Sequence, residues 1–313
     1  MEKYRNKDLP VEERVEDLLD RMTFEEKIDQ ITCLVTIADD IPEFENYIPN
    51  GIGNVGAFTV ADTVEPIVEY ADKLQKYLVN HTRLGIPALI HCEASAGAQF
   101  TEADVFPSAI AQASTFDTEV VGEMTDIIRK QMYYVGFRQA LSPVVDITRD
   151  PRWGRITETY GEDAALTSAM ASAFVKGIQG DELKEGVLAT AKHFAGHGIT
   201  EGGLNMGRNI VSERDMREIH CKPFQCAITE AGLKSVMNSY CSVNGEPVVG
   251  SKKMLTDILR GEMGFQGFVV SDYLSLDRLV DPFAVAENFE EAVIDSLKYV
   301  LNTDSIKQKF ESL

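Results

Sequence analysis

The chain has 313 residues, of which 44% are hydrophobic and 26% charged, a composition typical of globular rather than disordered proteins. Its 30 lysine and arginine residues against 50 aspartate and glutamate residues give a formal net charge of −20. That balance argues against a general binder of nucleic acids or anionic membranes, because those surfaces require clustered basic residues. The length suits one large α/β domain or two ordinary domains.

The beginning of the chain and the cysteines indicate a cytoplasmic location. Residues 1–20 are charged almost throughout and lack the apolar core of a signal peptide. No apolar run approaches the length of about 18 residues that a transmembrane helix needs. An odd number of widely spaced cysteines without a CxxC pair favours reduced thiols over a disulfide framework. The five are Cys33, Cys92, Cys221, Cys226 and Cys241.

The first predicted helix begins at a capping box. Thr23 and Glu26 are three residues apart, and the helix that follows would place Ile28 and Ile31 on its apolar face. A glycine-rich segment at 50–60 comes next. Further helices are then expected at 66–78, 116–134, 167–178, 212–231, 251–263 and 288–298. Strands are expected between them at 87–93, 139–147, 187–194, 234–240 and 267–272.

This alternation of strands and helices predicts a parallel sheet and an α/β fold. The chain contains neither GxGxxG after a first strand nor GxxxxGK[ST], which lowers the dinucleotide-binding and P-loop alternatives. Many βα units over this length favour a (β/α)8, TIM-barrel-like single domain. A last strand at 299–303 is uncertain, because Ile294, Leu297 and Leu301 would equally extend the preceding helix along one face.

Polar residues follow the ends of several predicted strands. In a parallel barrel, functional side chains gather at this edge. Together, carboxylates, cations and aromatic rings suit a polyhydroxylated ligand such as a sugar. These strand-end residues are Glu93, the segment 146–155, Lys192, His193, Asn238, Tyr240 and Asp272.

Asp272 is the strongest candidate for chemistry. It follows the apolar run at 267–270, so its carboxylate would emerge at the rim of a pocket, where Tyr273 could offer a ring face. Cations such as Arg155 and Lys192 would keep the carboxylate ionised, as a nucleophile requires. The alternative is a loop aspartate that caps the next turn.

Lys192 and His193 also have a purely structural interpretation, as a rim lysine and a buried histidine bonded to backbone. His193 and His197 are four residues apart, a spacing that could indicate a metal site. Ala195 and Gly196 follow a strand, however, and no acidic third ligand lies near in sequence, so we expect neither a metal nor another cofactor.

Several motifs resemble glycoside hydrolase family 3. They are DPRWGR at 150–155, KHF at 192–194, VMNSY at 236–240 and GFQGFVVSDY at 264–273, with LLDRMTFEEK at 18–27 and FPS at 106–108. The resemblance implies that residues 1–313 form the family's N-terminal (β/α)8-like barrel, which binds a terminal, non-reducing β-linked sugar. By motif, Asp272 would be the nucleophile that forms a covalent glycosyl-enzyme. The substrate-binding residues would be Glu93, Arg155, Lys192, His193, Tyr240 and Tyr273.

The resemblance leaves the acid/base residue open. In most of the family it is a glutamate of a following α/β sandwich domain, which we expect to be absent from this chain. One branch uses an Asp-Ser-His dyad after KHF, but the corresponding loop at 196–205 has no Asp-x-His, and only His197 or Glu201 could substitute.

The resemblance therefore implies a retaining β-glycosidase, first of all a β-glucosidase. The alternatives are a β-xylosidase and a non-hydrolytic sugar-binding barrel. The expected partners are a small β-glycoside or oligosaccharide, and a second copy or separate domain that covers the barrel face. No nucleic acid or membrane partner is expected.

Overall fold

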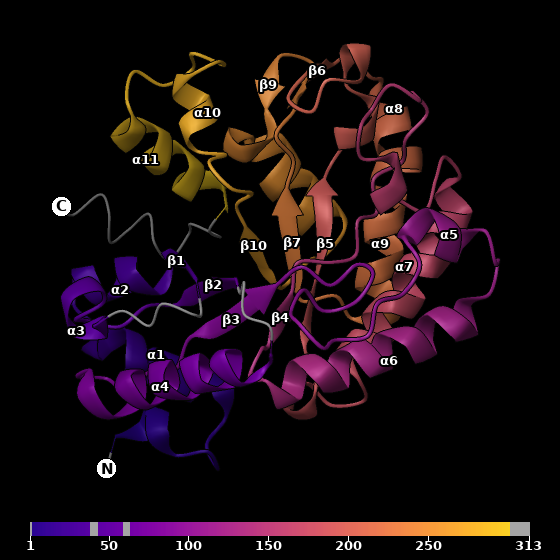
Figure 1. Ribbon diagram of the computed structural model, residues 1–313. Coiled ribbons are helices and arrows are strands. Elements are labelled where there is room, and N and C mark those ends of the chain that lie inside the picture. The colour runs from indigo at the N-terminus through magenta and orange to yellow at the C-terminus, as the bar shows by residue number, and fades with distance from the viewer. Residues whose placement is uncertain (1, 38–42, 59–62, 301–313) are drawn as a thin grey trace. The chain divides into compact units, whose positions relative to one another are not determined.

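The computed structural model of the protein describes residues 2–37, 43–58 and 63–300 (Figure 1). The chain divides into two compact units. Among the described residues, the N-terminal unit comprises 2–37, 43–58, 63–92, 99–103 and 134–139. The C-terminal unit comprises 93–98, 104–133 and 140–300.

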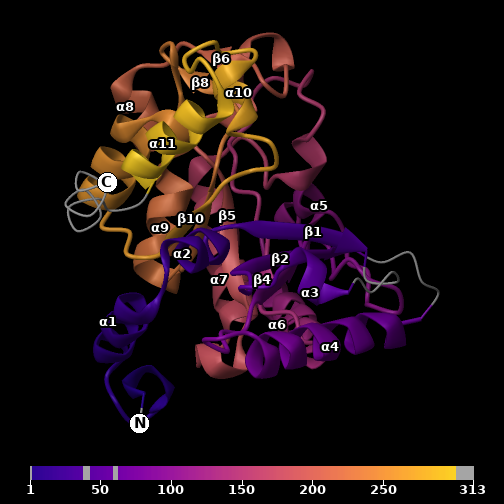
Figure 2. The same cartoon turned by 90° about the vertical axis from the view of Figure 1, so that its left-hand side faces the viewer.

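Three parallel strands form the centre of the N-terminal unit. They are β1 (Cys33–Ile37), β2 (Asn54–Phe58) and β3 (Leu89–Cys92), paired in that order. Helix α4 (Glu65–His81) lies along this sheet in both views (Figures 1 and 2). It buries the residues that its helical spacing predicted, which are Ile67, Tyr70, Ala71 and Leu74. The other helices of this unit are η1 (Lys3–Arg5), α1 (Val11–Arg21), α2 (Phe24–Gln30) and α3 (Phe44–Tyr47).

The predicted capping box at the start of α2 is confirmed. The backbone N–H of Glu26 donates to Oγ1 of Thr23, and the N–H of Thr23 donates to Oε2 of Glu26. The expected apolar face is only partly correct. Helix α2 ends at Gln30, so Ile31 falls beyond it and is 52% exposed.

The C-terminal unit is built on the parallel strands β5 (Leu188–Phe194), β7 (Ser235–Asn238) and β10 (Phe268–Val270). They lie side by side in Figure 1, with α7 (Ala164–Gln179) and α9 (Lys222–Ala231) packed against each other beside β5. Strand β7 is buried along its whole length, as expected of a parallel strand covered on both faces. The remaining helices here include α5 (Ala109–Ala113), α6 (Thr118–Tyr134), α10 (Asp277–Val280) and α11 (Phe289–Val300).

Three predicted elements differ from the structure, and a proline accounts for two of the differences. The strand expected at 139–147 is reduced to β4 (Gln139–Ala140) and a bridge between Val144 and Lys192, because Pro143 has no N–H to donate to a sheet. The single helix expected at 212–231 is divided into α8 (Glu213–Asp215), a π-helical turn at Met216–His220 and α9. Pro223 accounts for the division, since it cannot continue the preceding ladder of hydrogen bonds. The helix expected at 251–263 is π-helical over Lys253–Glu262.

The end of the chain follows the helical alternative as far as it is described. Helix α11 includes Tyr299 and Val300, the first residues of the strand expected at 299–303, and residues 301–303 lie outside the described residues. Helices α10 and α11 pack around Val249, Leu279 and Ala292.

The cysteines and the helix lengths were also part of the sequence predictions. All five cysteines lie in the described part of the chain and are free thiols, as predicted. Over residues 2–37, 43–58 and 63–300, no helix has both the length and the apolarity needed to cross a bilayer.

Candidate active site

The residues singled out in the sequence converge within the C-terminal unit. Strand β10 ends at Val270, and Asp272 follows it with only 8% of its side-chain surface exposed. Its Oδ1 accepts a hydrogen bond from the backbone N–H of Tyr273 at 2.8 Å and one from the phenol of Tyr240, also at 2.8 Å. A turn at 273–276 follows Asp272, whose Oδ1 accepts the N–H of its first residue, as the loop-aspartate alternative also expects, whereas α10 begins only at Asp277.

The other carboxylate oxygen of Asp272 is in a different situation. Within the described residues, Oδ2 is buried without a hydrogen-bond partner. Nε2 of His193 lies 3.6 Å away, beyond ordinary hydrogen-bond distance. Burial raises the pKa of Asp272, while the two hydrogen bonds to Oδ1 and the charges of Lys192 and Arg155 act in the opposite direction. The two cations expected near Asp272 are therefore close enough to act on it.

His193 is held by a carboxylate that sequence reasoning had not assigned a role. Nδ1 of His193 lies 2.7 Å from Oδ2 of Asp146, and the same oxygen accepts the backbone N–H of His193 at 3.1 Å. Burial, reinforced by the positive charges of Arg155 and Lys192, holds the pKa of His193 well below its ordinary value. The imidazole is therefore neutral near pH 7.

Lys192 is not the solvated rim lysine of the structural alternative. Its side chain is only 4% exposed, and Nζ lies 2.5 Å from Oε1 of Glu93, whose side chain is 29% exposed. Glu93 follows β3 in the chain and belongs to the same unit as Lys192. The ammonium of Lys192 is therefore buried, whereas the carboxylate of Glu93, to which it is paired, is still partly exposed to solvent.

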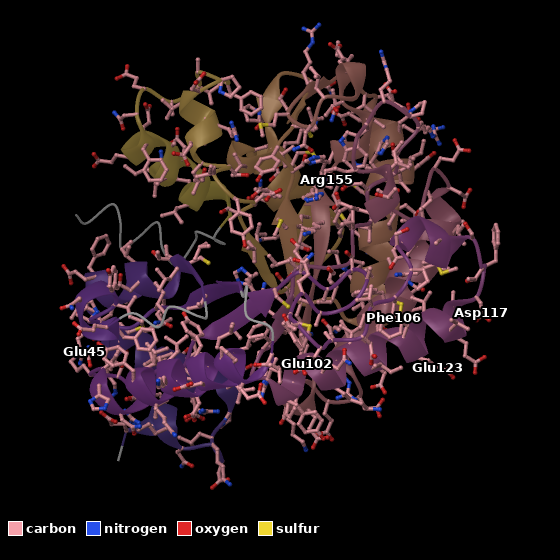
Figure 3. All side chains as sticks on the ribbon, in the orientation of Figure 1. Glu45, Glu102, Phe106, Asp117, Glu123 and Arg155 are labelled. Carbon is pink, nitrogen blue, oxygen red and sulfur yellow. The ribbon has the colours of Figure 1, made fainter. Side chains whose placement is uncertain are left out.

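Arg155 is oriented by Glu158 through two parallel hydrogen bonds. Nε contacts Oε1 and Nη2 contacts Oε2, each at 2.8 Å. Figure 3 draws Arg155 at the level of the arrowheads of β5 and β7. Because Glu158 occupies only two of the five guanidinium N–H groups, Arg155 keeps donors for a ligand.

Tyr240 and Tyr273 are joined to Asp272 through hydrogen bonds rather than through their rings. The hydroxyl of Tyr240 also lies 2.6 Å from the carbonyl oxygen of Tyr273. Burial and the neighbouring charge of Asp272 raise the pKa of Tyr240. Tyr273 is 41% exposed, so its ring is open to solvent while its backbone forms part of the site.

His197 and Glu201, the possible acid/base substitutes, are both engaged elsewhere. Nδ1 of His197 contacts Oγ of Ser239 at 3.2 Å, and Nε2 contacts Oδ1 of Asn205 at 2.8 Å. Burial lowers the pKa of His197 to about 3, and the positive charge of Arg155 acts in the same direction. Glu201 is exposed and pairs with Arg208.

The spacing of His193 and His197 reflects ring packing. The two rings lie 4.5 Å apart between centroids at an angle of 34°. Searched over the described ranges, the structure has no group of three or more His, Cys, Asp or Glu side chains arranged to hold a metal ion.

A hollow of about 610 Å³ between α6 and α7 is separate from this cluster, since it shares none of its residues. Half of its lining residues are charged, among them Glu123, Asp126 and Lys176, and the rest are small, such as Gly122 and Gly177. The helices pack closely at Gly177, where an added Cβ would lie 1.9 Å from Oγ1 of Thr125.

Comparison with known proteins identifies the family. Residues 23–304 match the glycosyl hydrolase family 3 N terminal domain, and the chain therefore belongs to this family. It is 39% identical to a β-xylosidase of Formosa agariphila over 72% of this chain and 32% of that protein. It is 33% identical to β-glucosidase C of Emericella nidulans over 86% of this chain and 48% of that protein.

Solved structures agree in fold. A β-glucosidase from Erythrobacter marinus matches 96% of this chain and 41% of its own with a TM-score of 0.89 and 32% identity. A β-glucosidase from Listeria innocua in complex with glucose matches 92% of this chain and 41% of its own with a TM-score of 0.80 and 30% identity. The expected α/β, TIM-barrel-like fold is confirmed. The chain spans less than half the length of each of these four proteins.

Proposed function

We propose that this chain is the sugar-binding barrel of a retaining β-glycosidase that acts on terminal, non-reducing β-D-glucosyl residues through a covalent intermediate on Asp272. The observation that carries the proposal is the asymmetry of the Asp272 carboxylate. Oδ1 is fixed by two hydrogen bonds, whereas Oδ2 is left without a partner among the described residues, beside a neutral histidine. A nucleophile needs this combination of orientation and an unoccupied lone pair.

In the proposed reaction, Oδ2 of Asp272 forms a bond to the anomeric carbon as the bond from that carbon to the leaving oxygen breaks. The leaving oxygen takes the bonding electrons, and water later hydrolyses the glycosyl ester. The hydrogen bonds from Tyr240 and the Tyr273 N–H keep the carboxylate in line during both steps.

The sugar hydroxyls are assigned to Glu93, Lys192 and Arg155. A carboxylate accepts from two hydroxyls, and the ammonium and guanidinium donate charge-assisted hydrogen bonds. Since Nδ1 of His193 is occupied by Asp146, Nε2 is the nitrogen left to face a ligand.

The second carboxyl of the retaining scheme should lie roughly 5–5.5 Å from the nucleophile. Each other carboxylate of the cluster already has a partner. Glu93 binds Lys192, Asp146 binds His193, and Glu158 binds Arg155. We therefore assign the proton donor to a group outside this cluster.

Two other functions have specific support. A β-xylosidase is favoured by the name of the relative that is 39% identical to this chain. A non-hydrolytic sugar-binding barrel is favoured by the pairing of every carboxylate of the cluster other than Asp272.

Hydrolysis of dinitrophenyl β-glucoside and β-xyloside separates these functions, because dinitrophenolate leaves without a proton donor. We expect kcat/KM for the glucoside to exceed that for the xyloside by about tenfold, the discrimination of one small substituent in a pocket. A faster xyloside would establish the β-xylosidase. Glucose binding by calorimetry without turnover of either glycoside would establish the binding barrel, and neither binding nor turnover would refute the proposal.

A further inference from the structure

We propose that Asp146 is a positioning residue that keeps the proton of His193 on Nδ1, so that Nε2 faces Asp272 as a lone pair and leaves Oδ2 free of hydrogen bonds. The inference rests on the proposed function, in which Asp272 is the nucleophile.

Asp146 and His193 are brought together by adjacent backbone segments. The N–H of Val145 donates to the carbonyl of Lys192 at 2.7 Å, and the N–H of Lys192 donates to the carbonyl of Pro143 at 3.0 Å. Asp146 and His193 are the next residues of these two segments. Their side chains are each 1% exposed, so the contact between them is closed to water.

Asp146 holds His193 through two hydrogen bonds. Oδ2 of Asp146 accepts both the backbone N–H of His193 at 3.1 Å and its Nδ1 at 2.7 Å. A carboxylate oxygen that already accepts a backbone N–H is best matched by a second donor, which requires the imidazole proton to be on Nδ1. Main chain and ring of His193 are thus fixed by one oxygen.

The opposite side of the ring shows why the tautomer matters. Nε2 lies 3.6 Å from Oδ2 of Asp272. A neutral imidazole carries a single N–H, and His193 is neutral because burial and two nearby cations lower its pKa. With the proton on Nε2, a small approach would form a hydrogen bond to Oδ2, stabilise the carboxylate and reduce its nucleophilicity. With the proton on Nδ1, no such bond can form.

Ring packing fixes the position of His193 but not its proton. The His197 ring lies 4.5 Å from the His193 ring and is itself held by Asn205 and Ser239. These neighbours would remain if Asp146 were replaced. The acceptor for Nδ1–H, by contrast, is supplied by Asp146 alone among the contacts of the His193 ring described here.

Nitrogen-15 NMR of the five histidines reads the tautomer directly, with His193 assigned from the spectrum of His193→Gln. We expect the Nδ1–H form in the unaltered protein and a shift towards Nε2–H in Asp146→Ala. In the same variant, the rate of covalent labelling by dinitrophenyl 2-fluoro-β-glucoside should fall by about 10- to 100-fold, as is usual when a residue that orients a functional ligand is lost. Asp146→Asn keeps the shape of the side chain but can turn its amide NH2 towards Nδ1, so it should also shift the tautomer towards Nε2–H and lower the rate.

Gln179→Ala is the matched control. Gln179 is buried at the end of α7, where its Nε2 bonds the carbonyls of Ala231 and Gly232, so the variant loses buried hydrogen bonds away from the site. We expect it to leave tautomer and rate unchanged. Nε2–H in the unaltered protein, Nδ1–H retained in Asp146→Ala, or an equal loss of rate in Gln179→Ala would each overturn the inference. Absence of labelling in the unaltered protein would refute the proposed function, while the NMR measurement would still decide the tautomer.

Discussion

Tyr240 and Asp272 meet across two paired strands. The phenol oxygen of Tyr240, which follows β7, lies 2.8 Å from Oδ1 of Asp272, which follows β10. Because β7 and β10 are parallel, both residues emerge at the same edge of the sheet. The proposed nucleophile is thus oriented by a side chain from the neighbouring strand.

Replacing Tyr240 by Phe should move the acidic limb of the labelling rate to higher pH. The Tyr240 hydrogen bond favours the ionised form of Asp272, against the burial that raises the pKa of that carboxyl. Without it, the pKa rises further and the nucleophile is protonated at higher pH. We expect a shift of about one pH unit, which corresponds to a hydrogen bond of about 1.5 kcal/mol to a charged group. Labelling rates measured against pH provide the check.

Tyr47→Phe serves as the control for this variant, because Tyr47 is exposed in the N-terminal unit. For Tyr47→Phe, the acidic limb of the labelling rate plotted against pH should coincide with that of the unaltered protein. An unshifted limb in Tyr240→Phe would show that the phenol does not tune Asp272.

Asp272→Asn should stabilise the fold near pH 7. Burial raises the folded-state pKa of Asp272 above the unfolded value of about 3.9, so ionisation in the folded protein is a cost that is absent below that value and develops as pH rises through the folded pKa. The amide is uncharged and can donate towards Nε2 of His193. Urea denaturation should give a gain of about 1 kcal/mol near pH 7 that disappears in acid.

Asp150→Asn should change the free energy of unfolding near pH 7 in the opposite direction. Hydrogen bonds from Arg152 lower the pKa of Asp150 to about 2, so its contribution is present above the unfolded pKa and is lost as pH falls through the folded pKa. The variant should therefore lose stability near pH 7. Destabilisation by Asp272→Asn near pH 7 would contradict the expectation that ionisation of Asp272 lowers the stability of the folded protein.

Glu93→Ala should destabilise the protein by about 2–3 kcal/mol, because it leaves the buried ammonium of Lys192 without its carboxylate. The predicted loss is at the lower end of the range, or below it, for breaking a fully buried ion pair, because Glu93 is partly exposed. The exposed pair of Glu182 and Lys184 gives a matched comparison. Glu182→Ala should change the free energy of unfolding by less than about 1 kcal/mol. Equal effects of the two variants would refute the buried role of Lys192.

Local signals in the sequence were sufficient for much of the fold. The Thr23 capping box and the spacing of Ile67, Tyr70 and Leu74 are written within single helices, and both predictions are confirmed. The positions of Lys192 and Asp272 were predictable for the same reason, since an apolar run ends at Ala191, directly before Lys192, and at Val270, two residues before Asp272. Residues at the ends of parallel strands then meet without further information.

Contacts between distant segments could not be read in this way. Asp146 lies 47 positions from His193, and its tight contact depends on the pairing of backbone segments that no local pattern records. Strands β1 and β2 were not predicted, because each is five residues long without clear alternation. The small sheet of β6 (Arg208–Asn209), β8 (Ser242–Val243) and β9 (Glu246–Pro247) was missed because its strands have two residues each.

Covalent labelling tests the central claim most directly. The protein would be incubated with dinitrophenyl 2-fluoro-β-glucoside, its intact mass measured and the modified peptide sequenced, with Asp272→Ala and a control variant at the exposed Asp181, Asp181→Ala, treated in parallel. We predict a single glycosyl adduct on Asp272, present in Asp181→Ala and absent from Asp272→Ala. An adduct on another residue, or undiminished labelling of Asp272→Ala, would contradict the assignment of Asp272 as the nucleophile.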